Sequence, residues 1–117
     1  MSKTIHVGLI NGRHDMPVND YIFDSVDDVF DYDDINRIVT NYIWDNCDVQ
    51  KTNGKPINGT RDAEASVYKA RNELVVYATG LSCVNAALVA ACARYGVRLM
   101  LMHHDRDTGN YYAQRVF

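Results

Sequence analysis

The sequence predicts an α+β domain in which a mixed, mostly antiparallel sheet is flanked by two helices. Short apolar runs bounded by turn residues indicate strands, and two longer segments have the apolar content or spacing of helices. Residues 74–102 have the pattern strand, helix, strand, which predicts one crossover between parallel strands. A chain of 117 residues is long enough for one core, so a single domain is expected over residues 1–117.

The N-terminal half contains two predicted strands and one helix. The first strand is expected over Thr4–Ile10, where Asn11-Gly12 ends it, and a short second strand over Tyr21–Phe23. The helix is expected to begin near residue 33 or 34, because the acidic residues there suit the positive end of a helix dipole. Its apolar stripe comprises Ile35, Ile38, Val39, Tyr42 and Ile43.

The C-terminal half begins with turn-rich residues 51–60, which predict a loop. Residues 66–71 and 74–78 are expected to be strands joined by a tight turn at Asn72-Glu73. A buried helix should follow, with Ser82 as its N-cap and Gly96 as its stop. Residues 97–102 and 111–117 are expected to form an antiparallel pair around a turn at 107–110.

Composition excludes several classes of protein. The formal net charge of -3 argues against a nucleic-acid polymer as partner, although a few arginines in one pocket suffice for a small phosphate ligand. No apolar run is long enough for a bilayer, and the start of the chain lacks the features of a signal peptide, so a cytosolic protein is expected. The three cysteines have no CxxC spacing, which favours small buried side chains over a disulfide framework or zinc site.

The first candidate site is the strand-to-helix junction Thr79-Gly80-Leu81-Ser82. Exposed N–H groups at a helix N-terminus attract phosphate, and Gly80 lets a ligand approach the backbone. Asn85 lies one turn further along, on the same face as Ser82. On this motif alone, an ordinary capped turn is the favoured interpretation.

The second candidate is His103-His104-Asp105-Arg106-Asp107. Adjacent strand residues point to opposite faces, so the two histidines are not expected to share a metal ion. Arg106 between two aspartates suits bidentate phosphate contact, with a charged hairpin tip as the equally weighted alternative. No metal and no cofactor are expected.

Two loops supply weaker candidates. Arg13 and His14 follow the first strand and are interpreted either as anion contacts or as solvated loop residues. Arg61 follows the turn-rich segment, where an arginine could close over a ligand as a lid or clamp. The sequence has no GxSxG elbow, so nucleophilic catalysis is poorly supported. The histidines leave a general base open. Aromatic residues that could stack on a base are Tyr21, Phe23, Tyr77, Tyr111 and Tyr112.

Several segments together resemble the Thoeris anti-defense protein 1 family of bacteriophages. They are Val7-Gly8-Leu9-Ile10-Asn11-Gly12-Arg13-His14, Met16-Pro17-Val18 with Tyr21-Ile22-Phe23, Tyr77-Ala78-Thr79-Gly80-Leu81, and residues 101–111. The resemblance implies a cyclic-nucleotide sponge, not an enzyme, in the host bacterial cytosol. Such proteins bind glycocyclic ADP-ribose without cleaving it, and some also bind cyclic oligonucleotides of CBASS immunity at a separate site. Homo-oligomers are implied, with dimers that build hexamers and pockets between protomers.

The resemblance also implies roles for individual residues. Arg106 and Asp107 of the terminal motif and Arg61 of the earlier loop resemble ligand contacts, while Arg13 and His14 would belong to the second site. Leu81 stands where a family member presents an aromatic ring, so hydrophobic contact would replace stacking. Two alternatives stay open: a phosphodiesterase or ring nuclease that cleaves a cyclic nucleotide, and a small acidic module that binds another protein.

Overall fold

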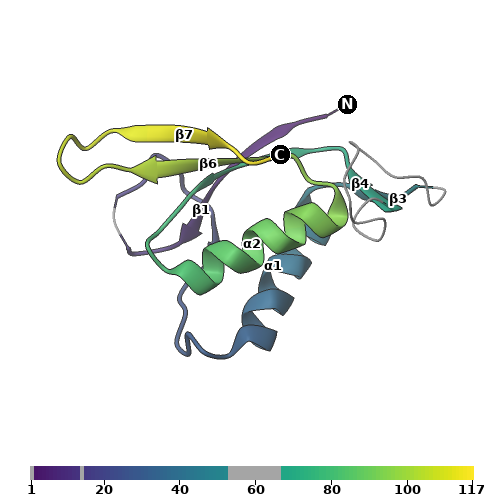
Figure 1. Cartoon of the computed structure of the whole chain (residues 1–117), viewed down its shortest axis with the longest axis horizontal. Coiled ribbons are helices and arrows are strands. Elements are labelled where there is room, and N and C mark those ends of the chain that lie inside the picture. The colour runs from purple at the N-terminus through teal and green to yellow at the C-terminus, as the bar shows by residue number, and fades with distance from the viewer. Residues whose placement is uncertain (1, 14, 53–66) are drawn as a thin grey trace.

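The computed structural model describes residues 2–13, 15–52 and 67–117. A five-stranded sheet has the order β2-β1-β5-β6-β7, and β3 pairs with β4 in a separate two-stranded sheet (Figure 1). The helices are α1 (Tyr32–Asn46) and α2 (Ser82–Tyr95). The strands are β1 (Thr4–Ile10), β2 (Tyr21–Phe23), β3 (Val49–Lys51), β4 (Tyr68–Ala70), β5 (Glu73–Tyr77), β6 (Leu99–His104) and β7 (Tyr111–Arg115).

The predicted α+β class, with two helices, a mixed sheet and a strand-helix-strand crossover, is confirmed. The expectation that the sheet is mostly antiparallel is wrong. In the larger sheet β1 pairs in parallel with β2 and β5, and β5 pairs in parallel with β6; β7 alone of its strands is antiparallel to its neighbour. The strand-helix-strand pattern predicts the parallel pairing of β5 with β6, but the apolar pattern does not show which strands lie beside β1.

The expected hairpin between residues 66–71 and 74–78 does not form, because β4 and β5 belong to different sheets. Strand β5 lies between β1 and β6, so both of its edges are occupied. Strand β4 instead pairs with β3, in the register Gln50↔Lys69. The turn at Asn72 therefore passes the chain from one sheet to the other.

Both helices lie on the same side of the larger sheet (Figure 1). Helix α1 is capped by the Asp31 carboxylate, which accepts a hydrogen bond from the Asp34 N–H at 3.1 Å, and it buries Ile35, Val39 and Ile43. These residues recur every fourth position, which is the spacing of one helix face. Each fully buried aliphatic side chain contributes roughly 1.5–3 kcal/mol.

The N-cap of helix α2 lies one residue earlier in the chain than predicted. The N-cap position is Leu81, and Ser82 is the first helical residue, so the expectation that Ser82 caps the helix is wrong. The predicted stop at Gly96 is confirmed: it adopts the left-handed conformation at φ 65°, and its N–H donates to the Cys92 carbonyl oxygen. Cys47 and Cys92 are fully buried, as expected of small apolar side chains, whereas Cys83 is half-buried.

Candidate functional site

At the carboxyl ends of two neighbouring strands, β1 and β5, the chain leaves the sheet in opposite directions. After β1 the chain continues to β2 on one side, whereas after β5 it enters α2 and continues to β6 on the other side. Ligands of sheets built from parallel strands bind outside the carboxyl ends of strands at such a point, because the diverging loops leave a crevice. The loops concerned carry Arg13 after β1 and Thr79-Gly80-Leu81 after β5.

A pocket of about 330 Å³ lies at the carboxyl ends of these strands, and residues from three segments of the chain line it. They are the loop after β1 (Arg13), the junction before α2 (Thr79, Gly80, Leu81) and the tip of the β6–β7 hairpin (Arg106). A second pocket of about 260 Å³ shares Thr79, Gly80 and Arg106 with it and is also lined by His103 and His104. We name the two adjoining pockets the junction site.

The backbone turn at the junction is fixed by the side chain of Asn85. Its Nδ2 group donates to the Thr79 carbonyl oxygen at 2.7 Å and to the Leu81 carbonyl oxygen at 3.2 Å. These two carbonyls define which end of the amide is nitrogen, so Oδ1 is the remaining atom. Among the described residues this buried oxygen has no hydrogen-bond partner. Asn85 therefore positions the turn rather than lining the pocket.

Gly80 leaves the front of the turn open, since a methyl group added there would meet no atom within 4 Å. Thr79 accepts a hydrogen bond from the Leu81 N–H at 3.4 Å, and α2 begins directly afterwards without a side-chain cap. The first N–H groups of an α-helix have no partner inside the helix. The open turn thus gives an anion access to backbone donors and to the positive end of the helix dipole.

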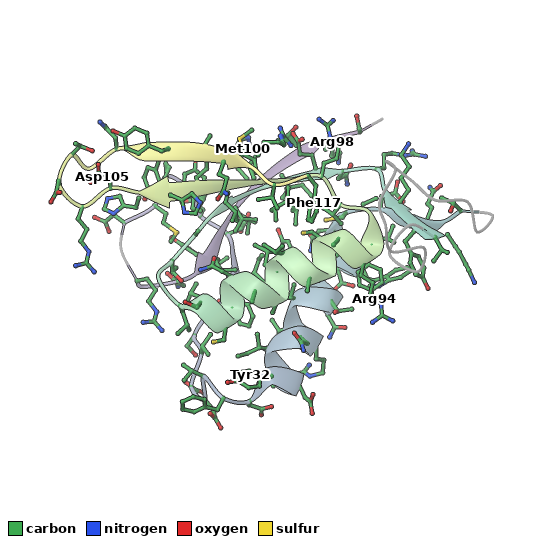
Figure 2. All side chains as sticks on the ribbon, in the orientation of Figure 1. Tyr32, Arg94, Arg98, Met100, Asp105 and Phe117 are labelled. Carbon is green, nitrogen blue, oxygen red and sulfur yellow. The ribbon has the colours of Figure 1, made fainter. Side chains whose placement is uncertain are left out.

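The two arginines of the junction site are exposed, and neither forms an ion pair with another residue in the described ranges. The neighbouring Asp105, at the hairpin tip in Figure 2, accepts a hydrogen bond from the Asp107 N–H at 2.9 Å. This carboxylate is thereby oriented toward its own loop. Arg13 and Arg106 bring two guanidinium groups to a single pocket, an arrangement suited to bidentate contact with phosphate.

An aromatic group connects the hairpin to the loop after β1. The Tyr111 hydroxyl donates to the Asp15 carbonyl oxygen at 2.7 Å, and the Tyr111 ring packs edge-on against Tyr77 with centroids 5.0 Å apart. Burial raises the pKa of Tyr111 above its ordinary value of 10.0. His104 lies 5.2 Å from the same ring. These contacts tie together the loops that carry Arg13 and Arg106.

The remaining predicted residues lie elsewhere. Ser82 is exposed at the start of α2, and Asp107 is exposed on the hairpin; neither lines the junction site. Arg61 and His14 lie outside the described residues. His103 is hydrogen-bonded through Nε2 to Gln114 Oε1 at 2.7 Å. Within the described ranges, no group of three or more His, Cys, Asp or Glu side chains could hold a metal ion.

Arg13 is the residue that sequence reasoning separated from the others. The family resemblance groups it with His14 at a second site, yet it lines the same pocket as Gly80 and Arg106. The parallel pairing of β1 with β5 brings it there, and an expectation of mostly antiparallel strands hides that neighbourhood. If the strands before Arg13 and before Gly80 are taken as parallel neighbours, the loops that follow them lie at the same end of the sheet, and this would have placed Arg13 beside Gly80.

No family model, no curated protein and no solved structure matches the chain. None of the helices in the described part of the chain is long and apolar enough to cross a membrane.

Proposed function

We propose that this protein binds and sequesters a cyclic nucleotide signal, such as glycocyclic ADP-ribose, without cleaving it. The observation that supports the proposal most directly is the pairing of Arg13 and Arg106 across the Gly80 turn in one pocket. The identity of the ligand comes from the resemblance to the Thoeris anti-defense family. The geometry of the pocket supplies the chemistry that such a ligand needs.

A cyclised ADP-ribose carries a pyrophosphate with two negative charges, and the junction site has one guanidinium group for each of them. Two guanidinium groups give charge-assisted hydrogen bonds, which are roughly twice as strong as neutral ones. The open turn at Gly80 and the start of α2 add N–H donors and a favourable dipole. Leu81 gives an apolar surface at the pocket for a base or ribose.

Sequestration needs slow release and no catalytic residue. His103 and His104 are the titratable groups beside the junction site that a ring nuclease would use as bases. His103 is engaged with Gln114 and His104 packs against Tyr111, so both side chains contribute to the hairpin that carries Arg106. A binding role accounts for these contacts without requiring a reaction.

The test is incubation with glycocyclic ADP-ribose, filtration, heat denaturation and chromatography of what is released. We expect the ligand to disappear from the filtrate and to return intact. Arg13→Ala and Arg106→Ala should each weaken binding about tenfold or more, because each removes a charge-assisted contact. The control is Arg94→Ala, which removes an exposed arginine at the far end of α2 (Figure 2) and should leave binding unchanged.

Each other outcome has a defined meaning. Release of a cleaved product would reject sequestration and show that the protein hydrolyses the nucleotide, as a ring nuclease does. Ligand that stays in the filtrate would reject this nucleotide, and a cyclic oligonucleotide should then be tried with the same variants. Competition between the two nucleotides would assign both to the junction site, whereas simultaneous binding would support a separate second site.

A further inference from the structure

A second cleft lies at the amino-terminal ends of the central strands, and many of the positively charged residues of the molecule line it. It has a volume of about 530 Å³ and lies where β1, β5 and β6 begin and where the β3–β4 sheet adjoins them. Figure 2 shows Arg98 at this end of β6 and Asp105 at the other end. Six strand residues separate the two, which corresponds to roughly 20 Å. The cleft is therefore distinct from the junction site.

The cationic side chains of this cleft come from separate segments of the chain. They are Lys3 before β1, Lys51 on β3, Lys69 on β4, Arg71 after β4 and Arg98 before β6. The chain has 12 Lys and Arg residues in all; without Lys55 and Arg61, which lie outside the described ranges, ten remain, and half of these line the cleft. All described lysines are among them. In a chain of formal net charge -3 this concentration is pronounced.

Few acidic groups offset these cations. Glu73 is the one acidic residue in the described lining, and it already pairs with Arg115 at 2.7 Å and Arg98 at 3.8 Å. Asp48 beside the cleft pairs with Arg71 at 3.3 Å. Within the described ranges none of the three lysines forms an ion pair. No carboxylate of the described residues therefore pairs with their ammonium groups.

We propose that this cleft binds a small polyphosphate anion through Lys3, Lys51 and Lys69. A concave surface focuses the potential of like charges and raises the local concentration of an anion. The lysine ammonium is a compact charge on a flexible stem, suited to phosphates whose spacing varies. No aromatic side chain is present in the described lining, so recognition rests on the phosphates and not on a stacked base. This proposal does not depend on the function of the junction site.

The experiment is calorimetric titration of the full chain with inorganic tripolyphosphate at low ionic strength. We expect binding that weakens as salt is added, because screening reduces attraction between exposed charges. The double variant Lys51→Gln/Lys69→Gln should weaken binding at least tenfold. Lys51→Arg/Lys69→Arg keeps the charges and should retain affinity within about threefold.

A charge-matched control distinguishes a site from overall attraction. Arg37→Gln/Arg94→Gln removes two exposed positive charges from the helices, and neither arginine is part of the described lining of the cleft. Tripolyphosphate affinity should be unchanged in this variant. Equal weakening in both double variants, or no binding by the wild type, would overturn the proposal. An unchanged thermal unfolding transition of Lys51→Gln/Lys69→Gln would confirm that this variant is folded, whatever the junction site binds.

Discussion

At the scale of single residues, Glu73 has an unusual position because two arginines face one carboxylate at the start of β5. Arg115 donates a hydrogen bond to it at 2.7 Å, and Arg98 lies 3.8 Å away. The hydrogen bond from Arg115 lowers the pKa of Glu73 below its ordinary value of 4.5. The pair also links the edge strand β7 to the centre of the sheet, because Glu73 and Arg115 lie on β5 and β7.

The lowered pKa of Glu73 predicts how stability depends on pH. A carboxyl group with a depressed folded-state pKa stabilises the protein above its unfolded-state pKa and loses that contribution as pH falls through the folded value. At pH 7 we expect Glu73→Gln to lower the free energy of unfolding by about 0.5–1 kcal/mol, typical of a partly exposed ion pair. Urea denaturation at pH 7 and at several values below 4.5 measures the difference from wild type.

The difference should shrink as the pH falls below 4.5 and disappear below the lowered folded-state pKa of Glu73, where both proteins carry an uncharged side chain at this position. A difference that is the same at every pH would contradict the electrostatic account and leave a packing effect. Thr4→Val is a useful control, because it removes a long, 3.5 Å hydrogen bond to the same carboxylate without removing a charge.

The sequence was informative about some site residues and silent about others. Gly80 and Arg106 were predicted from local chemistry, namely a turn before a helix and a guanidinium at a strand end, and both line the junction site. Asn85 was expected to contact the ligand, whereas its amide holds two carbonyls of the turn. Which way a side chain is directed depends on packing between segments, and local spacing alone does not contain that information.

At the scale of secondary-structure elements, the end of α2 depends on one glycine. Gly96 has φ 65°, a conformation that costs an L-residue about 1–2 kcal/mol. A methyl group added there would lie 2.3 Å from the Tyr68 carbonyl oxygen, which belongs to the backbone of β4. The Ala70 N–H donates to the Gly96 carbonyl oxygen at 3.3 Å, so the helix end and the β3–β4 sheet are in direct contact.

We therefore expect Gly96→Ala to lower the free energy of unfolding by about 2–4 kcal/mol, combining backbone strain with displacement of β4. Gly109→Ala is the matched control: it also has positive φ, 74°, but a methyl group there would meet no atom within 4 Å. It should cost about 1–2 kcal/mol, the strain alone. Chemical denaturation of both variants measures the difference. Equal costs would show that contact with β4 is unimportant.

The bounds of the strands were more predictable from the sequence than the pairing between strands. The bounds of β1 and β2 match the expected Thr4–Ile10 and Tyr21–Phe23, because turn residues follow the first strand and the apolar runs are short. The absence of pairing between β4 and β5 is not predictable, since a tight turn between two strands is compatible with a hairpin or with a change of sheet. Occupation of both β5 edges by β1 and β6 decides between them.

At the scale of the whole molecule, the junction site is shallow for tight binding by one chain. Arg13, Gly80 and Arg106 are all exposed, whereas tightly held ligands have most of their surface buried. A second copy of the chain beside α2 would add the missing wall. The outer face of α2 suits such contact, because Ser82, Ala86 and Ala90 are exposed, small and spaced four residues apart.

We accordingly expect the protein to self-associate through the outer face of α2, and the ligand to bind more tightly in the assembly than in one chain. Ala90→Glu places a charge in the middle of that face and should shift the wild-type oligomer to monomer in sedimentation velocity. Binding of glycocyclic ADP-ribose should weaken about tenfold or more, because the pocket loses its second wall. Asn36→Glu, an exposed change on α1, should alter neither quantity.

The relation between the two measurements decides what assembly does for the site. If Ala90→Glu dissociates the oligomer while affinity is unchanged, each chain binds the ligand alone and the exposed arginines suffice. If the wild type is itself a monomer, the outer face of α2 is simply a solvated helix surface of small residues. If Ala90→Glu both dissociates the oligomer and weakens ligand binding, Arg13 and Arg106 of one chain bind the phosphates, and contact between chains encloses the ligand.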